Sequence, residues 1–128
     1  MRLYHLSDGP YIMTGYSAIS RKLLNYLSDL GWDCHYQSHT AQHQPFEKGL
    51  KFEDGEELKF KIYGTGRRAY AMDMLVPKIR ELRPNVFGIL LDTFMLHPNS
   101  TGFPSFFDLD FSPAKTFFYF PSDGGGGL

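Results

Sequence analysis

The chain has 128 residues, a length that suits one domain. Hydrophobic residues make up 42% of it and charged residues 21%, a balance that excludes disorder for most of the chain. The 13 basic and 14 acidic side chains give a formal net charge of −1, which argues against a general electrostatic affinity for nucleic acid. Cys34 is the one cysteine and forms no internal disulfide, so a cytoplasmic location is expected.

The first predicted elements are a short strand over residues 2–7 and a helix that follows a glycine-containing loop. The helix is expected to begin near Thr14 or Ser17, either of which suits an N-cap. Gly31 stands where a left-handed glycine ends many helices, and a second strand is expected over residues 32–36. Apolar residues recur along the helix at steps of three and four: Tyr16, Ile19, Leu23, Leu27 and Leu30.

The middle of the chain predicts a hairpin and a second helix. Apolar and charged residues alternate over 50–53 and over 58–62, and Asp54-Gly55 lies between the two runs, as is typical of paired antiparallel strands. Pro77 lies inside the predicted helix, so a kink or a late start is expected there. Helical spacing relates four apolar residues of this segment: Ala71, Leu75, Ile79 and Leu82.

The last third of the chain predicts two more strands. Residues 86–91 are apolar except for Gly88, as expected of a strand buried on both faces of a parallel sheet. Another aromatic strand is expected over residues 116–120. Strands separated by helices require a parallel sheet with right-handed crossovers. We therefore predict a single α/β domain over residues 1–128, with a Rossmann-like, open, mostly parallel sheet flanked by helices. Four glycines before Leu128 are typical of a loop, so the domain is expected to be truncated there.

Ligands of such open sheets bind beyond the carboxyl ends of the strands, and three of these ends carry candidate site residues. At the first end, free N–H groups of the helix start suit a phosphate, although a tight loop path without a ligand is the alternative. Asp92 follows the buried strand directly, where its carboxylate would accept a hydrogen bond from a sugar hydroxyl or act as a base. Asp123 follows the last strand in the same way, and for both aspartates a cap or turn role is the alternative. The residues at the first end are Thr14, Gly15, Tyr16 and Ser17.

The glycine spacing argues against a dinucleotide site. Gly9 and Gly15 are six residues apart with no glycine between them, whereas the dinucleotide fingerprint needs three closely spaced glycines. The polar run 37–39 also lacks the acidic residue that would hold a ribose after the second strand. A nicotinamide-dependent oxidoreductase is therefore disfavoured.

Three histidines raise the question of a metal site. His35, His39 and His43 recur every four residues, which on a helix would place them on one face. His35 falls in a predicted strand, however, and no carboxylate or cysteine nearby completes a ligand set. We therefore expect solvated histidines and no metal.

Several segments together point to a known family. They are the opening strand, the loop ending Thr14-Gly15, the helix end Leu30-Gly31-Trp32, the run Arg83-Pro84-Asn85-Val86-Phe87 and the segment 115–124. In this order and spacing, which covers nearly all of the chain, they resemble the N-terminal half of glycosyltransferase family 4 enzymes. Those enzymes have the GT-B fold, in which two Rossmann-like domains face each other across a cleft.

The resemblance implies a retaining, metal-independent transfer of a hexose from a UDP- or GDP-sugar to an acceptor hydroxyl. In that family the N-terminal domain mainly holds the acceptor, and its first loop, here around Gly15, approaches the donor phosphates. The C-terminal domain binds the nucleotide-sugar, typically through a carboxylate pair spaced E-x7-E, and no two glutamates of this chain are eight apart. Without that domain the chain is expected to be inactive, because catalysis needs groups from both sides of the cleft.

The implied partners are the nucleotide-sugar, the missing C-terminal domain and a carbohydrate or lipid acceptor, and a lipid would bring a peripheral membrane contact with it. No cofactor and no nucleic acid are expected. The alternative function is a stand-alone Rossmann-like module that binds a nucleotide or a partner without catalysis. An exposed sheet edge or an uncovered aromatic face would also let the chain associate with itself.

Overall fold

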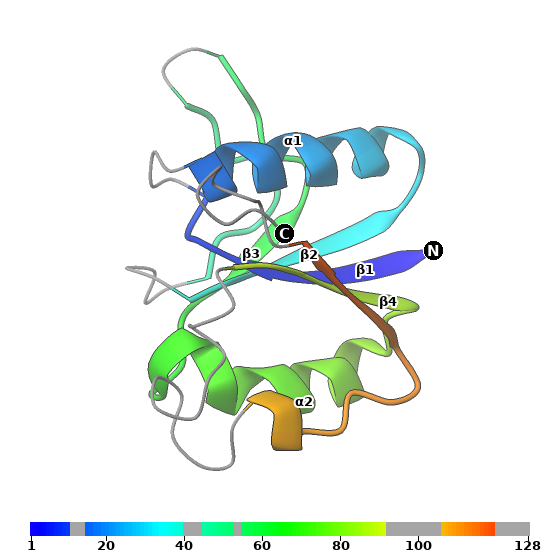
Figure 1. The fold of residues 1–128 in the computed structure, drawn as a ribbon. Helices are drawn as coiled ribbons and strands as arrows, with labels where there is room; N and C mark the ends of the chain where they lie inside the picture. Colours follow the sequence, from blue (N-terminus) through cyan, green and yellow to red (C-terminus); the bar gives the residue numbers. More distant parts are fainter. Residues whose placement is uncertain (11–14, 40–44, 53–54, 92–105, 120–128) are drawn as a thin grey trace, which may run out of the picture.

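Five parallel strands with helices on both sides make up the fold (Figure 1). A computed structural model describes residues 1–10, 15–39, 45–52, 55–91 and 106–119. The strands are β1 (Arg2–Ser7), β2 (Asp33–Ser38), β3 (Lys61–Tyr63), β4 (Val86–Leu90) and β5 (Lys115–Tyr119). Their spatial order is β3-β2-β1-β4-β5, and each neighbouring pair is parallel. The predicted Rossmann-like α/β fold is confirmed.

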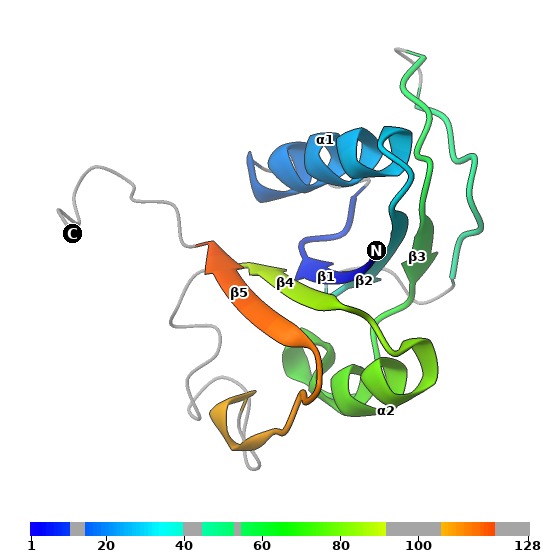
Figure 2. The ribbon, with the colours of Figure 1, turned by 90° about the vertical axis from the view of Figure 1, so that its right-hand side faces the viewer.

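The helices form a layer on each face of the sheet (Figures 1 and 2). Helix α1 (Gly15–Asp29) connects β1 to β2 on one face. Helix α2 (Met72–Leu82) connects β3 to β4 on the other, and the short 3-10 helix η1 (Ala69–Ala71) leads into it. A second 3-10 helix, η3 (Phe106–Asp108), lies on the α2 side before β5. No helix in these described ranges is long and apolar enough to cross a membrane.

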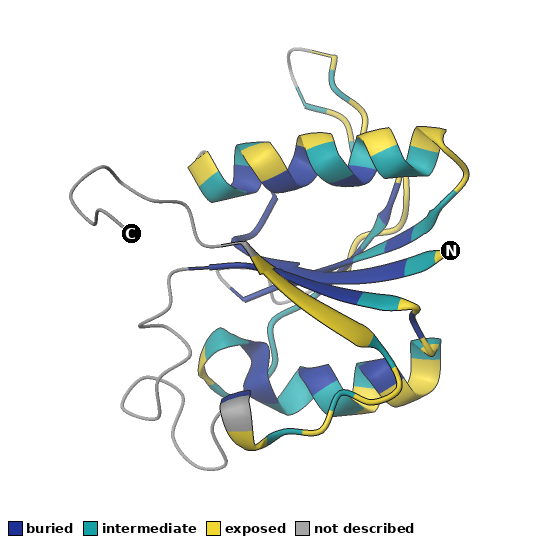
Figure 3. Ribbon diagram, turned by 45° about the vertical axis from the view of Figure 1, so that its right-hand side comes forward, coloured by how far each residue is buried: buried dark blue, intermediate teal, exposed yellow. Residues whose placement is uncertain are grey.

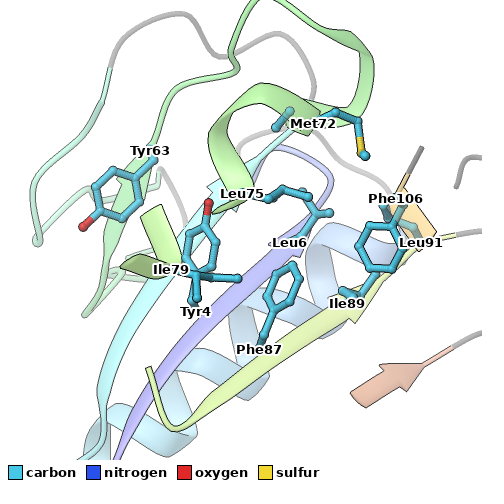
Figure 4. Close-up of a cluster of buried hydrophobic side chains, with 11 residues drawn as sticks. Tyr4, Leu6, Tyr63, Met72, Leu75, Ile79, Phe87, Ile89, Leu91 and Phe106 are labelled. Atoms are coloured by element: carbon cyan, nitrogen blue, oxygen red, sulfur yellow. The ribbon is translucent and has the colours of Figure 1, made fainter. Parts of the chain in front are cut away.

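Two hydrophobic cores hold these layers together, because successive side chains of a strand point to opposite faces. The core under α2 is built on Tyr4 and Leu6 of β1 and Phe87 and Ile89 of β4 (Figure 4). The core under α1 uses Leu3 of β1 and the alternate residues of β2. Its buried members are Leu3, Leu24, Cys34, Tyr36, Leu58, Phe60 and Ile62.

A chain of buried hydrogen bonds crosses the α2 side of the sheet. The Tyr4 hydroxyl donates to Gln37 Oε1 at 2.7 Å. Gln37 Nε2 in turn donates to the Ser38 carbonyl at 3.0 Å and to the Gly64 carbonyl at 2.9 Å. Burial raises the pKa of Tyr4 well above its ordinary value, so the hydroxyl keeps the proton that it donates. This relay satisfies the buried amide and joins β1, β2 and the segment after β3.

The first helix and the strands follow the sequence pattern closely. Helix α1 begins at Gly15, next to the predicted caps, and Gly31 beyond its end has φ +92°, the left-handed conformation expected of it. Strand β2 runs on to Ser38, two residues further than predicted, because it pairs with β1 as far as Ser7. Strand β4 is buried in all but its first residue, as predicted for a central strand.

The predicted hairpin forms only in part. Lys51 and Glu57 make an isolated antiparallel bridge, and Gly49 N–H and Leu58 carbonyl are joined at 2.8 Å. The second arm then continues into β3, which pairs in parallel with β2. Alternation alone does not distinguish a hairpin arm from an edge strand of the main sheet, since both have a two-residue period.

Helix α2 runs through Pro77 and does not stop there. The change of direction lies before the helix, where Tyr70 and Ala71 both have φ 56°. Left-handed backbone is unusual for residues with a Cβ, and two in succession make a sharp turn into α2. The late start expected at Pro77 is therefore wrong, and the turn at Tyr70 and Ala71 is a feature that the sequence analysis did not predict.

Candidate functional site

The strand connections place a candidate ligand crevice between β1 and β4. From β1 the chain moves through α1 to β2 on one side, and from β3 it returns through α2 to β4 on the other side of β1. Ligands of open α/β sheets bind at such a switch point, outside the carboxyl ends of the strands. Here the Ser7 hydroxyl donates to the Leu90 carbonyl at 2.9 Å, and this hydrogen bond joins the carboxyl ends of β1 and β4.

Helix α1 begins at this crevice with an open, exposed residue. Figure 1 shows the start of α1 on the same side of the molecule as the end of β1. Gly15 is exposed, and a Cβ built on it would meet no atom within 4 Å. The first N–H groups of a helix have no partners within the helix, and they attract anions together with the helix dipole. The start of α1 therefore has open space at Gly15, on the side from which a phosphate would approach the helix.

The next two predicted residues differ in exposure. Tyr16 is half-buried, whereas Ser17 is buried and its hydroxyl accepts a hydrogen bond from Arg21 Nη1 at 3.2 Å. Arg21 Nη1 also donates to the Pro10 carbonyl at 2.7 Å, and its guanidinium lies 3.5 Å from Glu56. This buried arginine fixes the start of the loop after β1 against α1, so Ser17 contributes to the scaffold of the loop.

A carboxylate and an imidazole meet at the ends of β1 and β2. His39 Nε2 lies 2.7 Å from Asp8 Oδ1, and both side chains are almost covered by protein. The carboxylate can only accept, so Nε2 carries the proton. The Tyr36 hydroxyl donates to the Asp8 carbonyl, and the Tyr70 ring lies 5.2 Å from the His39 ring. The pair holds two strand ends together and gives the crevice a polar border on the β2 side.

Beneath α1, His5 is a buried histidine that the sequence analysis did not single out. Its Nε2 lies 2.9 Å from Ser20 Oγ, and its Nδ1 has no partner among the described residues. Burial lowers the pKa of His5 to about 3, so the ring is neutral near pH 7. It lies under the first half of α1 and packs edge-on against Tyr36 at 5.8 Å.

The expectation of solvated histidines is wrong for the two that the structure describes. His39 is buried against Asp8. It was expected in an exposed loop, but β2 continues to Ser38, the residue before it. His35 Nδ1 lies 2.8 Å from the Tyr63 hydroxyl, and its Nε2 lies 3.0 Å from Asp33. Burial raises the pKa of Asp33, but hydrogen bonds from His35 and Arg2 outweigh it and lower the pKa overall. Within the described ranges no three His, Cys, Asp or Glu side chains cluster as metal ligands would.

Three of the predicted site residues, Thr14, Asp92 and Asp123, lie outside the described residues. Of the others, Gly15 and Tyr16 lie at the crevice and Ser17 points into the protein. The pair Asp8 and His39 was not predicted as a unit. One signal was present: each of the two follows the last residue of its strand, and the two strands are neighbours in the sheet.

These features define the class of the protein: an open, parallel α/β domain of Rossmann-like type, whose α1 begins at the switch point of the sheet. No protein-family model, curated protein or solved structure matches the chain. The class therefore depends on the strand order and the crossovers described above.

Proposed function

We propose that this chain is the acceptor-side domain of a cytoplasmic, retaining glycosyltransferase. The reaction moves a hexose from a UDP- or GDP-sugar to an acceptor hydroxyl, without a metal ion. The bond between the sugar C1 and the diphosphate oxygen breaks, a bond from C1 to the acceptor oxygen forms, and the acceptor proton leaves with the departing diphosphate or a base. A second domain binds the donor, and this domain alone has no activity.

One observation carries the proposal: α1 begins at Gly15, beyond the carboxyl end of β1, at the switch point of the sheet. Donors at a helix start suit a diphosphate, and the open space at Gly15 allows one to approach the backbone. The buried pair of Asp8 and His39 holds the ends of β1 and β2 in place beside the same crevice. Asp92 and Asp123 remain the predicted catalytic carboxylates, and Thr14 remains a predicted phosphate contact.

The test is a transfer assay on the protein expressed from its own gene. A tag at the start of the natural reading frame would capture its complete product, whatever its length. The purified protein is incubated with labelled UDP- and GDP-hexoses, and both sugar transfer and release of UDP or GDP are followed. We expect turnover of at least one of these donors. A complete protein that turns over none of them, with acceptor sugars and lipids present, would contradict the proposal.

A Gly15→Ala substitution in that protein should lower kcat/KM for the donor about tenfold, the size of one lost charge-assisted contact. The new methyl group meets no protein atom but lies where the phosphate would approach. The free energy of unfolding should stay the same or rise slightly, because alanine favours a helix over glycine. Gly31→Ala is the matched control. Gly31 has a φ of +92°, so alanine there should destabilise the protein, but kcat/KM of the folded enzyme should not change.

The 128-residue chain by itself should bind free UDP or GDP only weakly, with a Kd above about 1 mM, since half of the cleft is absent. Isothermal titration calorimetry measures this directly. A micromolar Kd for the isolated chain would instead support the alternative, a stand-alone nucleotide-binding module.

A further inference from the structure

Arg21 is a buried cation in the second turn of α1. Helix α1 is covered along the side that faces the sheet and exposed along its outer side (Figure 3). Arg21 lies among the covered residues, with only 7% of its surface exposed. Burying a charge costs free energy unless the group is paired and hydrogen-bonded, so a guanidinium in this position depends on specific partners.

Two of these partners belong to the crevice end of α1. Arg21 Nη1 donates to the Pro10 carbonyl at 2.7 Å and to Ser17 Oγ at 3.2 Å. Pro10 lies in the connection that leaves β1, and Ser17 lies in the first turn of α1. A single nitrogen therefore ties this connection to the helix turn that contains Gly15, where the phosphate is proposed to approach.

The other partners come from the partial hairpin, residues 49–52 and 55–58. The centre of the Phe52 ring lies 5.2 Å from the guanidinium carbon of Arg21, and Glu56 Oε2 lies 3.5 Å from its Nε. A planar guanidinium can stack on a ring and donate hydrogen bonds at the same time, so arginine suits this place better than lysine. The hairpin therefore helps to fix the orientation in which Nη1 reaches the connection after β1.

We propose that Arg21 is a positioning residue for the donor phosphates. It holds the connection after β1 and the first turn of α1 in the arrangement that receives the diphosphate. Because Arg21 is buried, it acts through the groups that it bonds to and not by contact with the donor. This inference rests on the proposed function, in which the phosphates approach the helix at Gly15.

Arg21→Lys in the complete protein tests this role. Lysine keeps the charge, but its single nitrogen cannot reproduce the joint contact with the Pro10 carbonyl, Ser17 and the Phe52 ring. Steady-state kinetics should show KM for the nucleotide-sugar raised about tenfold, with kcat and KM for the acceptor within about twofold of the wild type. An unchanged KM for the donor, or an equal rise in KM for the acceptor, would overturn the proposal.

Arg2→Lys is the matched control for this experiment. Arg2 also bonds to a carbonyl and a carboxylate, those of Leu82 and Asp33, but it lies at the amino end of β1, opposite to the crevice. The variant should lose stability and keep the donor KM of the wild type. If Arg2→Lys raises the donor KM as much as Arg21→Lys does, the effect comes from stability and Arg21 has no positioning role.

Hydrogen–deuterium exchange of the 128-residue chain gives a readout that needs no activity. Arg21→Lys should speed exchange about tenfold in peptides that contain residues 8–10 or 15–18 and leave β4 unchanged. Faster exchange in all peptides alike would show a loss of overall stability only, and would overturn the positioning role. If exchange changes locally but the wild type turns over no donor, the proposed function is wrong and the control of this connection by Arg21 stands.

Discussion

Acidification from pH 7 to pH 5 should lower the free energy of unfolding by about 2 kcal/mol through His5 alone. In the folded chain burial lowers the pKa of this histidine to about 3, whereas in the unfolded chain it has its ordinary value near 6.5. The unfolded state therefore binds a proton that the folded state cannot. Stability is unaffected above about pH 6.5 and falls by about 1.4 kcal/mol per pH unit from there down to about pH 3.

Urea unfolding at several pH values between 7 and 5 measures this loss, and His5→Gln provides the control. Glutamine does not titrate, and its amide can still bond to Ser20 beneath α1. The variant should be less stable at pH 7 but should lose about 2 kcal/mol less than the wild type on acidification. Carboxylates contribute mainly below this range, so they do not obscure the comparison. Equal losses in both proteins would contradict the assignment to His5.

Phe87→Ala should destabilise the chain by about 3–5 kcal/mol, which approaches the whole stability of a small domain. Phe87 is fully buried in β4, at the centre of the core under α2 (Figure 4). Its ring stacks on Tyr4 at 5.5 Å and meets the rings of Phe106 at 6.3 Å and Phe111 at 4.7 Å. Truncation leaves a cavity among three rings that the backbone of a central strand cannot close.

Phe46→Ala is the matched control for this prediction. It removes the same atoms from a side chain that is already 39% exposed, so the expected loss is about 1 kcal/mol or less. Urea denaturation at pH 7 compares the two variants with the wild type. A loss of stability at Phe87 no larger than that at Phe46 would show that the core under α2 is not organised around this ring.

The sequence predicted the parallel sheet because its signals are local. Residues 86–91 are apolar on both faces, and the three- and four-residue steps of α1 end at Gly31. The crevice was predicted for the same reason, since parallel order alone puts strand ends at one edge. Its details depend on register, which local patterns do not determine. Asp8 meets His39 only because β2 pairs with β1 as far as Ser7 and Ser38.

The buried histidine shows a further limit of sequence patterns. His5 is a polar residue within an apolar strand, and nothing nearby in the sequence indicates that Ser20 of α1 will bond to it. Its burial follows from the packing of α1 across β1, a contact between residues fifteen positions apart.

The hydrogen bonds that link Tyr4, Gln37 and Gly64 also help to fix the register of β2 against β1. If β2 slipped by one residue against β1, the Gln37 amide would turn into the apolar layer beneath α1 and lose every partner it has in the native alignment. An unpaired buried amide costs about 1–3 kcal/mol, so the shifted alignment of the two strands is less stable than the native one by about this amount. The hydrogen bonds of Gln37 therefore favour the native alignment of β1 and β2 over an alignment shifted by one residue.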